Sequence, residues 1–180
     1  SDHFAPWFPD GEGTQAWVYL GALGQVTQKQ IGTAVTPIVH HYHPGLVAQA
    51  FMSLEELYPG RVFLGVGSGE SVNETPLGMD WPPYEEQRRR LETGLEAITR
   101  LWNGETVTHH GLIHVEEARL YTRPEGRHPL IVGAALSEGT ARWMGEWADG
   151  LITVVAEREQ MQRIIDAFHE GGGEGKPLFL

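Results

Sequence analysis

Cysteine is absent from the sequence, so the chain can form no disulfide, thiol nucleophile or zinc–thiolate site. Basic residues are scarce: 13 lysines and arginines stand against 24 aspartates and glutamates, which gives a net charge of -11. A surface of this charge repels the phosphates of nucleic acids and of anionic lipids. No apolar run approaches the ~20 residues of a membrane-spanning helix. We therefore expect no nucleic acid and no membrane among the partners, and a cytoplasmic location.

The composition is otherwise that of a globular domain. Hydrophobic residues make up 41% and charged residues 21% of the 180 residues, near the average for folded domains. This length buries one core, and 1–180 contains no linker or low-complexity segment that would divide it. Because the chain begins at Ser1 and residues 177–180 are typical of a strand that has barely begun, we expect part of a longer single domain.

Short β-rich runs alternate with longer amphipathic runs. The pattern predicts strands over 30–36, 61–66, 130–134 and 150–155, another strand starting at 177, and helices over 44–57, 84–102, 138–147 and 159–169. This order predicts parallel strands joined by helices, hence an α/β sheet or barrel. A closed eight-stranded barrel takes about 250 residues, so roughly a third of one is missing. Residues 105–124 alternate instead, and predict a β-hairpin insertion that turns at His110-Gly111.

Reactive residues of parallel α/β folds gather where strands end, and His3 is the first candidate. It lies at the start of the chain, where a preceding strand would just have ended. An imidazole there can accept a hydroxyl proton near neutral pH, and the nearby Trp7 offers a flat wall for a ring. An ordinary polar loop is the alternative interpretation.

Two further segments follow strands. The glycine-rich residues 65–74 are not a dinucleotide fingerprint, because the third glycine position holds Glu70. A carboxylate carried by such a turn could transfer a proton, or it could be a solvated acid on a tight turn. Residues 134–140 run from a strand end into a helix start, whose free amides suit a phosphate; a simply capped helix is the alternative.

The remaining histidines and arginines give weaker signals. His40, His41 and His43 are spaced like metal ligands, but the first two would point apart and no carboxylate stands at ligand spacing. We therefore predict no metal site. His109, His110 and His114 fall in the hairpin and are expected at the surface. The run 88–90 is predicted to be a solvated helix face, with ligand contact as the minority interpretation.

Several of these segments together resemble a known family. Residues 1–7, 32–35, 42–51 and 57–70, followed by Asn73-Glu74, are similar to the deazaflavin-dependent branch of the luciferase-like oxidoreductases, and 57–70 is the most specific match. Within this branch the chain resembles the group of coenzyme F420-dependent glucose-6-phosphate and secondary alcohol dehydrogenases. The resemblance implies a (β/α)8 TIM barrel, present here from about the end of strand 2 to the start of strand 7. The hairpin 105–124 would then lie between strands 4 and 5, and the full-length protein would be a homodimer.

The resemblance also implies an activity and its residues. Such enzymes transfer a hydride between the CH–OH group of an alcohol or sugar-type small molecule and C5 of coenzyme F420. His3 matches the base that takes the hydroxyl proton, Glu70 the acid that serves N1 of the ring, and Trp7 an aromatic that steadies the charge there. We expect His3 and Glu70 on opposite sides of the ring. A cis peptide between Ala34 and Val35 is implied behind it. The implied cofactor contacts are Asp2, Ala34, Val35, Thr36, Ser68, Gly69, Asn73, Leu136, Ser137, Gly139 and Thr140.

The sequence departs from its relatives at two places. Leu136-Ser137 replaces a pair of glycines near the cofactor tail, and Glu157 replaces a lysine that binds a substrate phosphate. Because a carboxylate repels phosphate, we predict a neutral alcohol, sugar or hydroxylated lipid as the substrate, not glucose 6-phosphate. Two alternatives remain: an FMN-dependent luciferase-like monooxygenase that uses oxygen, and a non-catalytic deazaflavin carrier or sensor.

Overall fold

A parallel β-sheet forms the centre of the molecule. The computed structural model describes residues 2–38, 40–122, 126–154 and 157–180. Within them, strands pair in the order β1-β3-β6-β7-β8, and β2 also pairs with β3. All of these pairings are parallel, so the carboxyl ends of the strands open on one edge. The strands are β1 Ile31–Gly32, β2 Thr36–Pro37, β3 Val62–Gly67, β6 Leu130–Ala134, β7 Gly150–Ile152 and β8 Leu178–Phe179.

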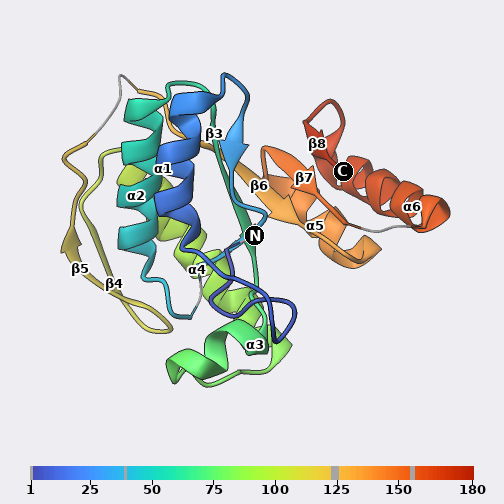
Figure 1. Cartoon of the computed structure of the whole chain (residues 1–180), viewed down its shortest axis with the longest axis horizontal. Coiled ribbons are helices and arrows are strands. Elements are labelled where there is room, and N and C mark those ends of the chain that lie inside the picture. Colours follow the sequence, from blue (N-terminus) through green and yellow to red (C-terminus); the bar gives the residue numbers. More distant parts are fainter. Residues whose placement is uncertain (1, 39, 123–125, 155–156) are drawn as a thin grey trace.

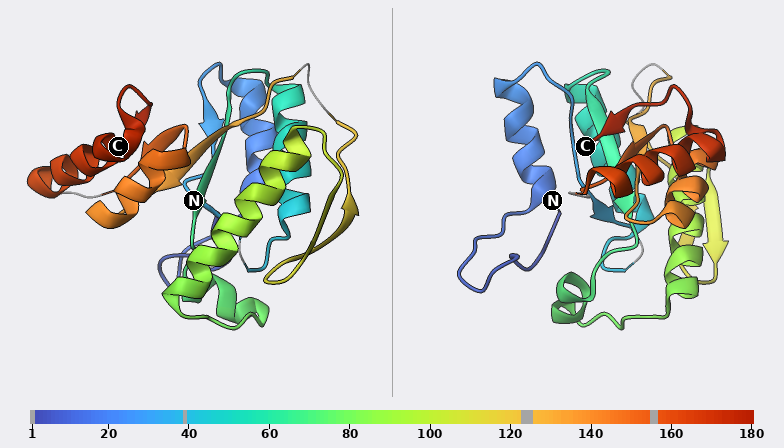
Figure 2. Two further views of the ribbon diagram at one scale, coloured as in Figure 1. Left: turned by 180° about the vertical axis from the view of Figure 1, so that it is seen from behind. Right: turned by 90° about the vertical axis from the view of Figure 1, so that its right-hand side faces the viewer.

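The predicted helices follow the strands in the expected order: α2 Pro44–Leu57, α4 Tyr84–Trp102, α5 Glu138–Trp147 and α6 Arg158–Phe168. The structure adds α1 Ala16–Val26 and the short helix α3 Ser71–Glu74. Figures 1 and 2 show α1, α2 and α4 side by side at one end of the sheet and α5 with α6 at the other. The predicted apolar stripe of α4 is buried and includes Leu91, Ile98 and Leu101. Among the described residues, no helix is both long enough and apolar enough to cross a membrane.

Helix α1 has no counterpart in the sequence-based prediction. Its first turn is capped by Gln15, whose side chain accepts a hydrogen bond from the backbone amide of Val18. The helix contains Gly21 and Gly24, which weaken a helical signal. Gly24 is required by packing, because a Cβ there would overlap the ring of Tyr58. The helix therefore depends on a long-range contact that a local pattern cannot show.

The strand predicted over 30–36 is interrupted. The structure has the short strands β1 and β2 instead, with the expected cis peptide between Ala34 and Val35 separating them. The chain at this interruption packs closely against β3. A Cβ at Gly67 would lie 2.7 Å from the Val35 side chain, and one at Gly65 would overlap the Thr33 carbonyl. Gly65 and Gly67 in β3 are thus explained by the close approach of residues 33–35.

A β-hairpin lies where the sequence analysis expected one. Strands β4 Val107–His110 and β5 His114–Ala118 form a separate antiparallel pair that packs beside α4. The turn lies at 111–113, slightly later than predicted, because His110 still pairs with His114. Val115 is buried while its neighbours His114 and Glu116 are exposed, as expected for a strand with one solvated face.

The C-terminal part differs in two details from the prediction. Strand β7 ends at Ile152, and Val155, the predicted end of that strand, lies outside the described residues. The glycine run 171–173 is part of a π-helical turn, His169–Gly173, which continues α6 beyond the predicted end of the helix at 169. A Cβ at Gly171 would overlap the Arg142 carbonyl of α5, and Gly172 adopts a φ of 98°. Glycine here lets the end of α6 touch α5 directly.

Candidate active site

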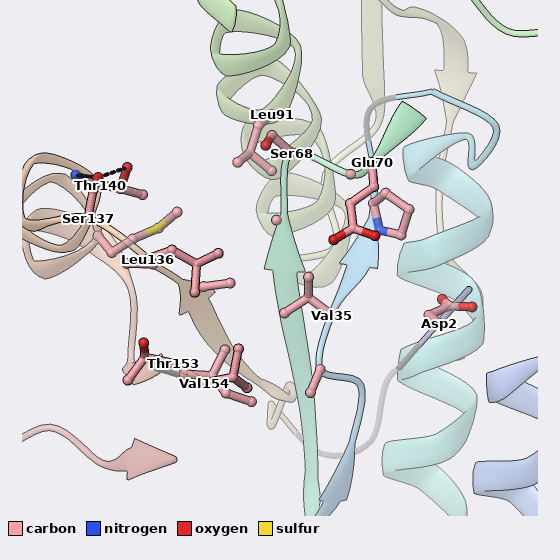
Figure 3. Close-up of a pocket in the computed structure, with 18 of the residues that line it drawn as sticks. Asp2, Val35, Ser68, Glu70, Leu91, Leu136, Ser137, Thr140, Thr153 and Val154 are labelled. Atoms are coloured by element: carbon pink, nitrogen blue, oxygen red, sulfur yellow. Dashed lines mark hydrogen bonds between the residues drawn. The ribbon is translucent and has the colours of Figure 1, made fainter. Parts of the chain in front are cut away.

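A cavity of about 580 Å³ opens at the carboxyl edge of the sheet. Figure 3 shows Glu70 and Val35 facing it from one side and Leu136 and Val154 from the other, with Asp2 set back from the centre. Predicted residues that line it are Asp2, His3, Trp7, Ala34, Val35, Ser68, Gly69, Glu70, Asn73, Leu136, Ser137 and Thr140. Most of these residues belong to the three segments that the sequence analysis selected because they follow strand ends.

His3 and Glu70 lie next to each other in the wall. Their closest atoms, Nε2 and Oε2, are 3.7 Å apart, and the side chains are 17% and 47% exposed. The Trp7 ring lies 4.7 Å from the imidazole, centroid to centroid, tilted by 50°. A flat ring between the two groups would need a gap of ~7 Å, twice a carbon contact distance. The expectation that they stand on opposite sides of a ring is thus wrong for this structure, where they form one wall.

Asn73 holds the Glu70 turn against the N-terminal loop. Its Oδ1 accepts a hydrogen bond from the Ala5 amide at 3.1 Å, and its Nδ2 donates to Glu70 Oε2 at 3.5 Å. Gly69 permits the turn, because its φ is 81° and a Cβ there would lie 3.0 Å from Pro37. Asn73 is 2% exposed and both polar groups have protein partners. The structure supports a positioning role for this predicted cofactor contact.

Asp2 anchors the loop that carries His3. Its Oδ2 accepts from Trp17 Nε1 at 2.9 Å and from Thr36 Oγ1 at 2.8 Å, and its Oδ1 accepts from the Tyr42 hydroxyl at 3.0 Å. Asp2 is 3% exposed. Thr36, a predicted cofactor contact, does not line the cavity; it is fully buried in this network. The strand break at Ala34-Val35 turns Thr36 inward, which corrects that prediction.

The Tyr42 hydroxyl is expected to titrate late. Burial, and then the negative charge of Asp2, raise the pKa of Tyr42 from 10.0 to about 12. Since the folded state favours the neutral phenol, this contribution to stability is fully present below pH 10 and is lost as pH rises toward 12. A tyrosinate absorbance titration should show one late tyrosine that Tyr42→Phe removes. Titration of that tyrosine near its ordinary pKa in the folded protein would contradict the network.

The opposite wall is the start of α5. Ser137 caps this helix, accepting from the Thr140 amide at 3.4 Å, and its hydroxyl lies 3.0 Å from Thr140 Oγ1. Gly139, predicted to contact the cofactor tail, does not line the cavity. It borders an adjoining hollow of about 390 Å³ with Arg163. Leu136 and Ser137 line both the cavity and this hollow, so the contact of Gly139 with the cofactor tail stays a prediction.

Helix α4 contributes residues that the sequence analysis did not assign to the site. Tyr84, Arg88 and Leu91 line the cavity. Their spacing of four and three residues puts them on one helix face, which continues the apolar stripe toward the N-terminus. The Arg88 guanidinium stacks on the Trp143 ring of α5 at 4.5 Å and pairs with Glu92 at 3.1 Å. The solvated-face prediction thus fails for Arg88. Further unassigned lining residues are Pro37, Gly67, Ala134, Ala135, Trp143, Met144, Ile152, Thr153 and Val154.

The three histidines at 40–43 have separate partners. His41 Nδ1 lies 2.5 Å from Glu74 Oε2, so a carboxylate does stand beside it, 33 residues away in sequence. His40 packs near Trp81, and burial lowers its pKa. His43 Nε2 contacts the His114 carbonyl at 2.7 Å. No carboxylate stands near these histidines in the sequence, and the one beside His41 comes from a distant segment that spacing cannot show.

The chain is similar to a known protein family and to several of its members. The family model for luciferase-like monooxygenases matches residues 1–177. An F420-dependent glucose-6-phosphate dehydrogenase of Microbacterium testaceum is 41% identical over 176 residues, covering 95% of this chain and 52% of the relative. The protein of the same description from Nakamurella multipartita is 46% identical over 156 residues, covering 85% and 46%.

A solved structure is also similar. The F420-dependent secondary alcohol dehydrogenase in complex with an F420-acetone adduct has a TM-score of 0.88 and 34% identity, covering 98% of this chain and 55% of that one. The chain spans about half the length of the curated relatives it matches.

Proposed function

The chain belongs to the luciferase-like family, and from this premise we propose that it supplies the cofactor site and the proton-transfer residues of a coenzyme F420-dependent oxidoreductase. The predicted TIM-barrel α/β fold is confirmed by the family match and by the similar alcohol dehydrogenase structure. The proposed reaction exchanges a hydride between a CH–OH group and C5 of the deazaflavin. Both curated relatives described above are F420-dependent dehydrogenases, which supports this choice over an FMN-dependent monooxygenase.

The observation that carries the proposal is the pairing of His3 with Glu70 at the cavity wall, 3.7 Å apart. Coenzyme F420, when bound, supplies the hydride acceptor. His3 is proposed to take the proton of the substrate hydroxyl at Nε2, which makes loss of the hydride easier. The carboxyl group of Glu70 would provide the proton that the ring nitrogen takes up, and the carboxylate left behind would stabilise the imidazolium of His3. The Trp7 ring packs against the imidazole of His3 and restricts its orientation.

The residues present fit a flat, multi-ring cofactor. The cavity of about 580 Å³ has apolar side chains on facing walls, including Val35, Leu91 and Met144. Such walls exclude water from the reacting atoms. Ser137 and Thr140 offer hydroxyl groups at the far wall, where we propose the phosphate-bearing tail to lie. Direct contacts of Ser68 and Gly69 with the ring belong to the same proposal.

A neutral substrate is proposed from the charges of the described lining residues. Among them, Arg88 is the one arginine or lysine, and it is already paired with Glu92 and stacked on Trp143. Val154 presents an apolar side chain that is 81% exposed. Glu157 follows shortly after it and is exposed. A phosphorylated sugar would meet little positive charge here, whereas a secondary alcohol would not need it.

Reduction of F420 by panels of substrates tests this function. We expect the protein to reduce F420 with neutral secondary alcohols or sugars, and glucose 6-phosphate to give little or no turnover. Glu157→Lys should lower the KM for glucose 6-phosphate by about tenfold, the effect of one charge-assisted hydrogen bond. Glu159→Lys, in the first turn of the helix that Glu157 precedes, serves as the matched control. Efficient turnover of glucose 6-phosphate by the unaltered protein would refute the substrate proposal. Fluorescence quenching by FMN but not by F420 would refute the cofactor assignment.

A further inference from the structure

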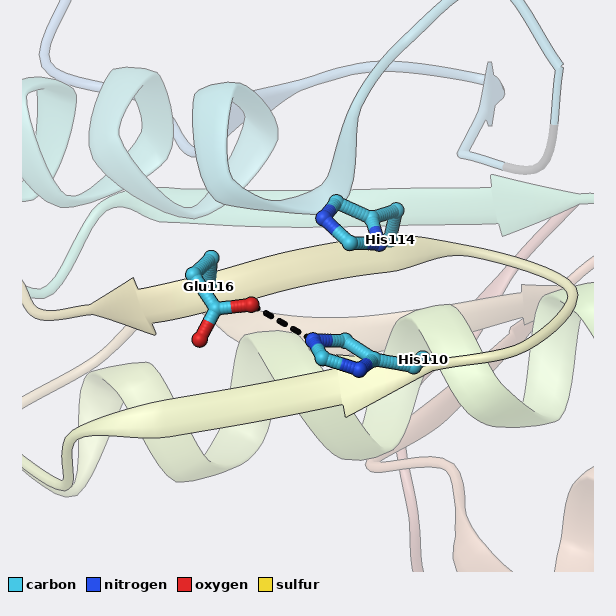
Figure 4. Close-up of side chains that lie close together, drawn as sticks. All are labelled: His110, His114 and Glu116. Carbon is cyan, nitrogen blue, oxygen red and sulfur yellow. Dashed lines mark hydrogen bonds and ion pairs between the residues drawn. The ribbon is translucent and has the colours of Figure 1, made fainter.

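We propose that the β4–β5 hairpin carries a binding site for a divalent transition-metal ion of the zinc type, formed by His110, His114 and Glu116. These three residues do not line the candidate active site, and the proposal is independent of the function proposed above. The sequence analysis expected the hairpin histidines only as surface residues. The structure instead brings two of them together with a carboxylate (Figure 4).

The hairpin register places the ligands on one face. His110 and His114 are direct cross-strand partners, and their rings are stacked with centroids 4.7 Å apart and planes 14° from parallel. Glu116 follows His114 by two residues, so it leaves the strand on the same face. Diagonal neighbours across an antiparallel pair lie within reach of long side chains. The grouping therefore results from the strand ladder and does not depend on one side-chain rotamer.

The distances suit a metal after small side-chain rotations. The possible ligand atoms all lie within 4.8 Å of one another, and His110 Nε2 is 2.5 Å from Glu116 Oε2. Two ligands of a tetrahedral zinc ion are separated by about 3.3 Å, given metal–ligand distances near 2.0 Å. His110 would move slightly away from Glu116 and His114 slightly toward them. Changes of this size require no movement of the backbone.

The backbone beneath the site is held in place. Ile113 and Val115 are buried under the hairpin, and Arg90 donates to the Leu112 carbonyl at 3.3 Å. The ring of His43 contacts the His114 carbonyl at 2.7 Å, which ties the hairpin to the start of α2. A ligand set on such an anchored turn loses less conformational freedom when the ion binds. The site is therefore partly preorganised.

The chemistry of the ligands selects the class of ion. Imidazole nitrogen suits zinc, cobalt, nickel and copper, whereas calcium and magnesium prefer sites built entirely from oxygen. Three protein ligands leave a coordination position for water, as in open zinc sites. The side chains of His110 and Glu116 are 59% and 56% exposed, so the ion can enter without opening the fold. A bound ion would join β4 to β5 and stabilise the hairpin.

The test is titration of the full, untagged chain, freed of metal by a chelator, with zinc sulfate in a calorimeter. We expect one ion per chain and no binding of magnesium. His110→Gln and Glu116→Gln should each weaken zinc binding by about tenfold or more, since even an outer partner of a ligand contributes that much. The matched controls are His109→Gln and Glu117→Gln, their chain neighbours outside the cluster. Both controls should bind zinc like the unaltered protein.

Thermal unfolding with and without zinc is the second measurement, and it shows whether each variant is folded before its zinc affinity is compared. Zinc should raise the thermal unfolding temperature of the unaltered chain and of both controls, by an amount that grows with the logarithm of the ion concentration above the Kd, but not that of the two site variants. Absence of stoichiometric binding would overturn the proposal. So would equal weakening in controls and site variants, because the ion would then be held by other groups. In either case the short contact of His110 with Glu116 is an ordinary surface ion pair.

Discussion

Replacing His3 with alanine is expected to lower the rate of alcohol oxidation by about 10²–10⁴-fold, the usual contribution of a general base. Binding of coenzyme F420 should survive, because the cavity walls around Val35, Leu91 and Leu136 do not depend on the imidazole. The expected loss follows from the position of His3: its ring is 83% screened from solvent, touches Trp7 and faces Glu70. Without the base, the substrate hydroxyl must give its proton to water.

Single-turnover reduction of F420, alongside fluorescence quenching, separates rate from binding. His109→Ala is the control, since His109 lies on the remote hairpin and does not line the cavity. A slowed rate with unchanged F420 affinity is the expected result. If the rate changes little, the non-catalytic carrier or sensor becomes the better interpretation. If affinity and rate fall together, His3 binds the cofactor and does not act as the base.

Replacing Asp2 with alanine is expected to destabilise the fold by about 3 kcal/mol, because it removes the best acceptor of the Trp17 indole and the acceptor of the Tyr42 hydroxyl. Thr36 loses one partner but keeps Thr33 Oγ1 as an acceptor. Each buried donor without a partner costs about 1–3 kcal/mol, and the indole and phenol are only partly buried. Asp2→Asn keeps one acceptor oxygen and should cost less, about 1 kcal/mol. Urea unfolding followed by tryptophan fluorescence measures both values.

Asp10→Ala is the matched control, because Asp10 is an exposed acid in the same N-terminal segment. It should leave the free energy of unfolding unchanged. A stable Asp2→Ala protein that has lost only its affinity for F420 would show that Asp2 acts as a direct cofactor contact. That outcome would restore the role implied by the family resemblance over the anchoring role that the hydrogen bonds support.

The order of strands and helices was predictable because it follows from local periodicity. The strand-end rule also selected segments that contain His3, Glu70 and Ser137, which line the cavity because parallel strands bring their carboxyl ends to one edge. The break between β1 and β2 was not visible as a break, because Ile31 and Thr36 fit one apolar run. Thr36 was expected to contact the cofactor because of the family resemblance, and the sequence alone did not show its hydrogen bond to Asp2.

Long-range partners could not be found from spacing. The pairing of His41 with Glu74, and of Asp2 with Trp17, joins segments whose separation in the sequence carries no periodic signal. Arg88 had a signal, because it lies three residues before Leu91 on the same helix face, but an arginine at that place is equally typical of a solvated turn. Only the position of α5, whose Trp143 ring lies against Arg88, shows that Arg88 faces the cavity and not bulk solvent.

The close packing of β3 against residues 33–35 has a consequence for redesign. Neither Gly65 nor Gly67 can gain a side chain without displacing Thr33 or Val35, so Gly67 and Val35, which line the floor of the cavity, are closed to variation. Leu136 and Val154, by contrast, are 63% and 81% exposed and can change size freely. Evolution of new substrate preferences, or their engineering, should therefore proceed through the rim while the base of the hollow stays fixed.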